Sequence, residues 1–356
     1  MPSASAWPPT LYNRELTSIL DQARCWFLHS GIQEPNGGVA RYYRSDLQKN
    51  AAVSTEITGY AASALAYLGQ IDEAVRAASY LTDQAWDETS HAFPFEPGSP
   101  LSYFFDTGII ARGLLAVHRA TGDDRYRARA GDAALSLAFD FMGDGVFHPV
   151  IQLPEKQPIA YETRWSRSPG CYQLKSALSW LEAAGDRGRQ PFETLLAYSL
   201  ATHESFLAGH DAESTMDRLH AYCYFLEALL WVSGREQVRD ALRRGIDRVA
   251  SLLGEIAPRF ERSDVCAQIL RVRLAAHHLG AVELNETAAS DEAERAASYQ
   301  STSNDPRLRG GFWFGRKDDE MLPFMNPVST AFCMQALALW SGHQSGTWRF
   351  ELSELI

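Results

Sequence analysis

The sequence predicts an all-α fold in which six helical hairpins close into a ring. A segment with a polar or acidic start and an apolar, small-residue body recurs along the 356 residues, starting at positions 56, 106, 171, 217, 264 and 328. A more charged segment with helical periodicity precedes each of them. Successive starts are 50, 65, 46, 47 and 64 residues apart, which is typical of a hairpin repeat with insertions.

The more charged, amphipathic helices are expected on the outside of this ring. We place them at residues 16–30, 71–86, 123–141, 191–208, 235–256 and 282–299. The apolar segments are expected inside, the last one beginning at Pro327, where proline suits the first helical position. The long connections 37–53, 87–104, 142–169 and 300–325 all precede inner helices, so they should share one rim with the polar helix starts.

The hairpins are expected to form a closed rather than an open array. An open array needs terminal repeats with polar outer faces, and neither the first nor the last hairpin is more polar than the middle ones. We therefore predict an (α/α)6 toroid with short β segments in the rim loops, as a single domain over residues 1–356. The polar helix starts would meet at one end, where we expect the functional site.

The composition excludes several classes of function. A net charge of −11 and a pI near 5.4 argue against a nucleic-acid surface, and no apolar run approaches the ~20 residues of a membrane span. The opening stretch MPSASAWPPTLYN lacks the features of a signal peptide, and the five cysteines show no zinc-ligand spacing. We expect a cytoplasmic protein with no metal or cofactor and no nucleic-acid or membrane partner; the oligomeric state stays open.

Several motifs resemble a known family. They are Gly37-Gly38 ahead of EITGY at 56–60, HAYCYFLEALL at 220–230 and SDVCAQ at 263–268. These segments resemble bacterial polysaccharide-biosynthesis proteins with a toroid-like domain, within the six-hairpin (α/α)6 superfamily of carbohydrate-active proteins. The resemblance covers nearly the whole chain and implies an oligo- or polysaccharide ligand. The DxDD motif of terpene cyclases and the zinc-ligand spacings of other toroid families are absent.

Carboxylates near the expected rim are candidates for proton transfer. Reactions at glycosidic bonds commonly use two carboxyl groups, one protonated and one ionised. Glu56, Asp106 and Asp264 are our catalytic candidates, with Glu56 and Asp106 as the favoured pair. The aromatic residues before Asp106 would raise its pKa. The alternative is that these acids only cap helix N-termini.

Basic and aromatic residues near the same rim are candidates for binding. Arginines in an acidic protein suggest an anionic sugar, such as a uronic acid, although they could instead neutralise the rim acids. Asp264, Gln268 and Arg271 share one helix face, and Lys175 could also point into a wet cavity. The binding candidates are Tyr60, Glu162, Arg164, Trp165, Tyr172, Asp217, His220, Arg262, Gln268, Arg271 and Trp313.

Two classes of function remain open. The first is a glycan-active enzyme, and we favour a hydrolase that uses Glu56 and Asp106. A close alternative within this class is a polysaccharide lyase or C5-epimerase that uses tyrosine or histidine as its base. The second is a glycan-binding protein of a polysaccharide-assembly system. Two carboxyl groups that converge across the cavity within the ~5–10 Å typical of hydrolases would favour the enzyme, whereas complete pairing of the rim acids with arginines would favour binding alone.

Overall fold

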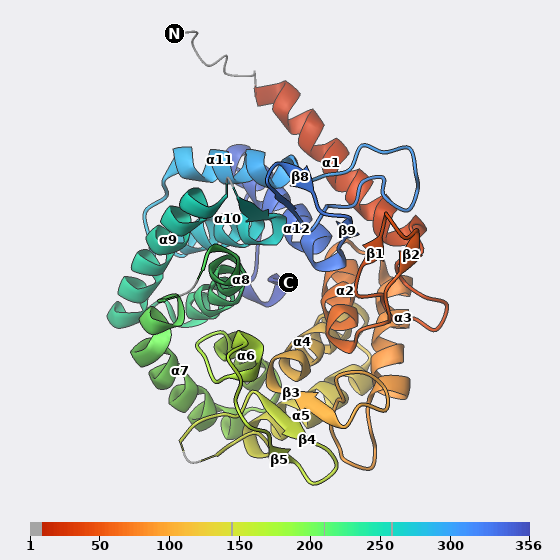
Figure 1. The fold of residues 1–356 in the computed structure, drawn as a ribbon, viewed down its shortest axis with the longest axis vertical. Helices are drawn as coiled ribbons and strands as arrows, with labels where there is room; N and C mark the ends of the chain where they lie inside the picture. Colours follow the sequence, from red (N-terminus) through yellow and green to blue (C-terminus); the bar gives the residue numbers. More distant parts are fainter. Residues whose placement is uncertain (1–8, 144, 210, 258) are drawn as a thin grey trace.

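The computed structural model describes residues 9–143, 145–209, 211–257 and 259–356. Within these ranges twelve α-helices alternate between an outer and an inner layer (Figure 1). The outer helices are α1 (Pro9–His29), α3 (Ile71–Tyr80), α5 (Asp124–Phe139), α7 (Asp186–Phe206), α9 (Glu236–Ile256) and α11 (Glu286–Ala297). The inner helices are α2 (Thr55–Tyr67), α4 (Phe104–Thr121), α6 (Gln173–Ala183), α8 (Ala212–Leu229), α10 (Ser263–His278) and α12 (Pro327–Gln344).

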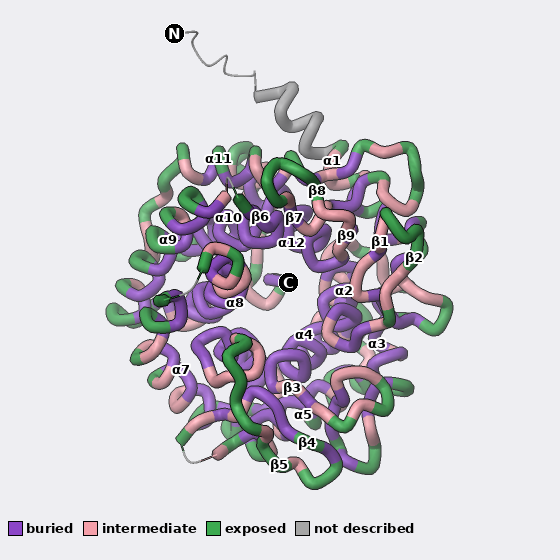
Figure 2. The backbone as a smooth tube through the Cα atoms, in the orientation of Figure 1, coloured by how far each residue is buried: buried purple, intermediate pink, exposed green. Residues whose placement is uncertain are grey.

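The inner helices form a closed ring. Each one contacts the next along the chain, and α12 contacts α2 to complete the circle (Figure 1). The inner helices are buried along most of their length, whereas the outer helices and the rim loops carry the exposed residues (Figure 2). An inner helix has neighbours on every side, which explains why its sequence is apolar all round. The closed six-hairpin architecture predicted from the repeat is confirmed.

Glycines let the inner helices approach closely. A Cβ atom on Gly113 of α4 would lie 2.4 Å from the carbonyl oxygen of Gly59 in α2, and one on Gly108 would lie 2.2 Å from Cβ of Ser176 in α6. These separations are far below ordinary van der Waals contact, so only glycine fits at these two positions. The small residues of the inner helices therefore set the spacing around the ring.

Three small antiparallel sheets lie in the rim loops. They are β1 (Tyr43–Arg44), β2 (Lys49–Asn50) and β9 (Phe324–Met325); β3 (Leu101–Tyr103), β4 (Val150–Gln152) and β5 (Gln157–Pro158); and β6 (Phe260–Arg262), β7 (Gly315–Lys317) and β8 (Glu320–Met321). Strand β3 continues directly into α4, and β6 continues directly into α10. One residue, the N-cap Asn326, separates β9 from α12. The sheets thus fix where three inner helices begin.

Four helix starts differ from the sequence-based expectation by four residues or more: α1 begins at Pro9 instead of residue 16, α11 begins at Glu286 instead of residue 282, and α7 and α8 also differ. Helix α8 begins at Ala212, because the Asp211 side chain caps it by accepting a hydrogen bond from the Ser214 backbone N–H at 2.8 Å. Asp217 therefore lies in the second turn of α8. Helix α7 begins at Asp186 and contains Pro191 inside it, so the proline does not mark the helix start. No helix of the described ranges has the length and hydropathy needed to cross a bilayer.

Candidate functional site

A cavity of about 280 Å³ lies at the rim where the inner helices begin. Charged groups and aromatic rings make up most of its wall. They are Glu56, Asp106 and Asp264; Arg41, Arg164 and Arg262; and Phe95, Tyr103, Phe105, Trp165, His220 and Tyr224. A small number of convergent polar groups among aromatic rings is typical of a ligand-binding pocket.

The three acids reach this cavity because each lies in the first turn of an inner helix. Ser54 caps α2 and accepts a hydrogen bond from the Ile57 N–H, which places Glu56 next to the helix start. Strand β3 leads into α4 and positions Asp106, and strand β6 leads into α10 and positions Asp264. Residues far apart in the sequence thus meet because the inner helices point the same way.

Glu56 and Asp106 form a pair of carboxyl groups that hold protons unusually tightly. Burial raises the pKa of Glu56 to about 7, and the charge of Arg41 only partly offsets this. Burial also raises the pKa of Asp106 well above its ordinary value, and the neighbouring Glu56 charge raises it further. One oxygen of Asp106, Oδ2, has no hydrogen-bond partner among the described residues. Near neutral pH the pair therefore holds one acid that is protonated and one that is partly ionised.

Asp264 behaves differently, because Arg262 holds it in a two-pronged ion pair. The Nε and Nη2 atoms of Arg262 donate to the two oxygens of Asp264 at 2.9 and 2.7 Å, and Nη1 donates to Asp217 at 2.8 Å. Burial opposes ionisation of Asp264, yet Arg262 and His220 together bring its pKa below the ordinary value. Asp264 is thus held as an ionised carboxylate by Arg262, in contrast to the pair of Glu56 and Asp106.

His220 forms the middle of a buried hydrogen-bond chain. Its Nδ1 lies 2.8 Å from Oε1 of Gln268, and its Nε2 lies 2.8 Å from the hydroxyl of Tyr224. An amide oxygen only accepts hydrogen bonds, so Nδ1–H donates to Gln268 and Nε2 accepts from Tyr224. Burial and the Arg262 charge lower the pKa of His220 to about 4. The imidazole is therefore neutral at physiological pH and holds the Tyr224 hydroxyl at the cavity wall.

Two further cations line the cavity. The Arg41 guanidinium lies 5.0 Å from the centre of the Phe95 ring, and Arg164 is exposed at the cavity edge. Within the described ranges neither side chain is held in an ion pair with a carboxylate, unlike Arg262. Their charges act on the acids, since both arginines oppose the rise in the pKa of Asp106. The cavity can therefore receive an anionic group.

Half of the site residues expected from the sequence line this cavity. They are Glu56, Asp106, Asp264, Arg164, Trp165, His220 and Arg262. Asp217 and Gln268 lie behind them, in direct contact with Arg262 and His220 respectively. These two residues contact lining groups and are not themselves part of the cavity wall.

Arg271 does not point into the cavity, contrary to expectation, and neither does Lys175. Arg271 Nη2 donates to Glu227 Oε1 at 2.5 Å and Lys175 Nζ donates to Glu227 Oε2 at 2.8 Å, with all three side chains fully buried. Burial opposes ionisation of Glu227, but the two cations lower its pKa below the ordinary value. Burial lowers the pKa of Lys175 to about 7 against the attraction of Glu227. The polar face of α10 thus begins at the cavity with Asp264 and, at Arg271, lies in the buried centre of the ring.

Four other expected binding residues also lie away from the cavity wall. Tyr172 is buried and its hydroxyl donates to the Ser168 carbonyl oxygen at 3.1 Å. Glu162 is exposed and accepts from Arg167 at 2.6 Å. Trp313 packs against the core beside the rim, and Tyr60 lies deeper, with its ring stacked on Tyr224 at 6.4 Å between ring centres.

Several lining residues were missing from the expected set. Tyr103 and Phe105 flank Asp106 in sequence, and that proximity is a signal that could have found them. Arg41 also lines the cavity and comes from the rim connection 37–53. Phe95 and Ser166 carry no sequence signal, because the folding of long rim loops brings them to the cavity. Across the described ranges, no group of three or more His, Cys, Asp or Glu side chains is arranged to hold a metal ion.

The fold can be compared with known proteins. No protein-family model matches the sequence, and a search of curated proteins finds no match. Among solved structures, a sugar epimerase from a ruminal bacterium is similar with a TM-score of 0.70 at 11% identity, over 92% of this chain and 98% of that chain. The chain has the (α/α)6 toroid fold.

Two further structures support this assignment. Cellobiose 2-epimerase from Spirochaeta thermophila is similar with a TM-score of 0.68 at 15% identity, over 94% of this chain and 99% of that chain. An unsaturated glucuronyl hydrolase specific for heparin is similar with a TM-score of 0.65 at 12% identity, over 92% and 96%. At these identities the likeness concerns the fold, and function has to be argued from the site.

Proposed function

We propose that the chain is a carbohydrate-active enzyme that hydrolyses an oligo- or polysaccharide containing an anionic sugar. The observation that carries the proposal is the pair of Glu56 and Asp106 in one cavity, both with raised pKa values. Perturbed carboxyl groups in a cavity are candidates for general acid–base catalysis. Toroids of the same fold include a hydrolase that acts on sugars, which is consistent with the proposal.

The pKa values suggest how the two acids divide the reaction. Asp106 keeps its proton at neutral pH and is placed to donate it to the glycosidic oxygen as the bond breaks. Glu56 is the first of the pair to ionise, near pH 7, and serves as the base for the attacking water or as the nucleophile. We expect kcat/KM to rise with pH through about 7, because the protonated form of Glu56 in the free enzyme is inactive.

The charge balance favours an anionic substrate. Arg262 is already paired with Asp264 and Asp217, so the cations left for a ligand are Arg41 and Arg164, which face a Glu56 that is only partly ionised and an Asp106 that stays protonated. A positive charge thus remains in the cavity, and an arginine fork matches a carboxylate. A uronic acid residue is therefore the favoured sugar, with Trp165 and Phe95 available to contact its ring.

A second candidate, sugar epimerisation, follows from the His220 chain. A neutral imidazole that accepts from Tyr224 could take up a proton and so let the Tyr224 oxygen abstract one from a sugar carbon. Tyr224 lines the cavity beside Phe105. Sugar epimerases are among the structures of the same fold. A bacterial polysaccharide-assembly role and a cytoplasmic location remain predictions from the sequence.

One experiment separates these reactions. The protein is incubated with neutral and uronic-acid oligosaccharides in H2O and in D2O, and product masses are followed. Hydrolysis gives fragments that have gained water, a lyase gives unsaturated fragments, and an epimerase leaves the mass unchanged in H2O but incorporates deuterium in D2O. Binding without any of these changes would favour the glycan-binding alternative.

Variants then assign the groups. Asp106→Asn should abolish hydrolysis without lowering the melting temperature. Tyr224→Phe should leave the hydrolysis rate largely unchanged. Hydrolysis that survives in Asp106→Asn would refute the acid assignment. Loss of deuterium incorporation in Tyr224→Phe alone would identify the epimerase.

A further inference from the structure

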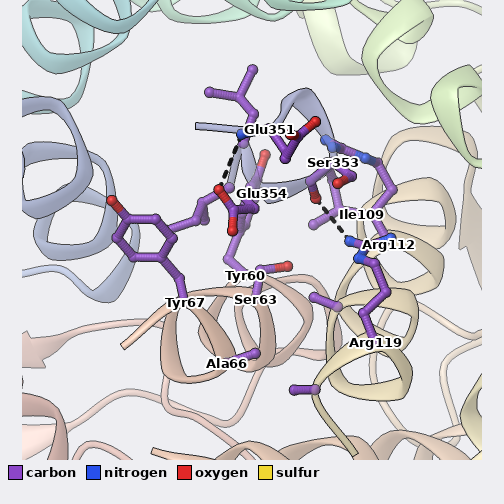
Figure 3. A pocket seen from close by; sticks show the side chains of 14 residues that line it. Tyr60, Ser63, Ala66, Tyr67, Ile109, Arg112, Arg119, Glu351, Ser353 and Glu354 are labelled. Carbon is purple, nitrogen blue, oxygen red and sulfur yellow. Dashed lines mark hydrogen bonds between the residues drawn. The ribbon is translucent and has the colours of Figure 1, made fainter. Parts of the chain in front are cut away.

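A second cavity, of about 360 Å³, lies at the opposite end of the ring from the rim site. It opens between the later turns of α2 and α4 and the segment 351–356, which runs under the ring toward its centre (Figures 1 and 3). The volume exists because the facing helix positions are small: Ser63, Ala66, Ala116 and Ala120. None of the groups proposed for the rim reaction lines this cavity.

Fixed contacts hold the segment 351–356 against the ring. The Arg119 guanidinium donates to the Ser353 carbonyl oxygen at 2.7 Å, and Gln335 Nε2 donates to the Glu354 carbonyl oxygen at 2.8 Å. The backbone N–H of Ile356 donates to Gln335 Oε1 at 3.2 Å, and the Ile356 side chain is buried. The cavity is therefore a built feature of the fold, with a wall on three sides.

The polar groups of this cavity suit a neutral, hydroxyl-rich ligand. The lining cations Arg112 and Arg119 both pair with Glu182, and the lining acids Glu351 and Glu354 lie across from them (Figure 3). Because Glu182 already pairs with both arginines, and Glu351 and Glu354 add negative charge, an anionic ligand gains little there. Carboxylates and guanidinium groups beside hydroxyls offer both acceptors and donors to the many hydroxyls of a sugar.

Tyrosines complete the site. Tyr67 contributes a ring and a hydroxyl at the cavity wall, where burial and the Glu354 charge raise its pKa to about 12. Tyr60 is 98% buried and lines the cavity; its hydroxyl, close to the Tyr224 side chain, makes no hydrogen bond of standard geometry within the described ranges. A buried polar atom without a partner is costly, so a ligand hydroxyl there would be stabilised. The Tyr60 ring, stacked on Tyr224, separates this cavity from the rim site.

We infer that the cavity between α2, α4 and the segment 351–356 is a second binding site, which takes a neutral sugar of one or two rings. The inference is independent of the reaction proposed for the rim. It assigns Tyr60, Ser63 and Tyr67 as hydrogen-bonding groups, and it assigns Arg119 and Glu354 to the polar edge of the cavity.

The test uses methyl α-D-glucopyranoside and methyl α-D-mannopyranoside as probes, with inorganic phosphate as the charged comparison. Binding to the whole protein is measured by calorimetry and by saturation-transfer NMR. Ala116→Phe fills the cavity from α4, and Ala120→Trp blocks it from an exposed position where the fold tolerates the change. Trp165→Ala is the matched change at the rim.

The expected result is that Ala116→Phe and Ala120→Trp each weaken binding of the methyl glycosides at least tenfold, with melting temperature and any rim turnover unchanged. Trp165→Ala should leave this binding within twofold. Binding that is lost in Trp165→Ala but kept in both blocking variants would place the sugar at the rim and overturn the inference. Absence of glycoside binding, or binding of phosphate alone that the blocking variants remove, would also overturn it.

Discussion

Replacing Glu56 by glutamine should make the protein more stable at high pH but not at low pH. In the folded protein burial raises the Glu56 pKa to about 7 from an ordinary value of 4.5. The folded state therefore binds this proton more tightly than the unfolded state, and stability falls as the pH rises from 4.5 through 7. A shift of about 2.5 units at 1.36 kcal/mol each corresponds to about 3 kcal/mol lost by the wild type above pH 7. Glutamine carries no charge, so Glu56→Gln does not lose this stability as the pH rises.

Urea unfolding at constant ionic strength between pH 4.5 and 8.5 measures this difference. Near pH 4.5 we expect the free energies of unfolding of the two proteins to differ little. By pH 8 the free energy of unfolding of Glu56→Gln should exceed that of the wild type by about 2–3 kcal/mol. Glu155→Gln is the matched control, because Glu155 is exposed in the β4–β5 turn and its replacement should show no such gain.

A stability difference between wild type and Glu56→Gln that does not change with pH would refute the reasoning. It would mean that the carboxyl group ionises in the folded protein as readily as in water. A gain that appears with the opposite sign, largest at low pH, would mean that Arg41 and its neighbours stabilise the ionised form more than burial opposes it. The pH-rate profile of any identified reaction should then also lack an inflection near 7.

Three further changes have definite outcomes. Gly113→Ala should lower the free energy of unfolding in urea by about 1–3 kcal/mol, because its Cβ would lie 2.4 Å from a carbonyl oxygen of α2. The control Gly254→Ala, in open space on α9, should be neutral or stabilising, and equal effects of the two changes would contradict the close packing. Glu227→Gln removes the carboxylate shared by buried Lys175 and Arg271, which keep their 3.3 Å contacts with an Ile356 oxygen, and should cost about 3–5 kcal/mol; a loss below about 1 kcal/mol would show that water reaches the cluster. Arg164→Ala should raise KM about tenfold for a uronic-acid oligosaccharide with little change in kcat, and similar losses for a neutral oligosaccharide would remove Arg164 from anion recognition.

The architecture was predictable because its signals are local and repeated. Each inner helix is apolar all round because it is buried on all sides, and each carries polar residues at its start, so the alternation of helix types is written in the sequence. Placement of Glu56, Asp106 and Asp264 at one rim followed from this alternation, since parallel inner helices bring their starts together. The strands of the rim loops have only two or three residues, so only their presence could be expected.

The sequence by itself determined the ring, the polar rim and three acids of the cavity, because helical periodicity and helix starts depend on neighbouring residues. Only the tertiary structure decided that Arg262 faces the cavity while Arg271, two turns further along, meets Glu227 from α8 in the buried centre. Residue spacing shows on which side of a helix a side chain lies, but it does not show whether that side chain lies at the rim or in the buried centre of the ring. The pKa values of Glu56 and Asp106 and the cavity under the segment 351–356 likewise depend on which distant groups pack together.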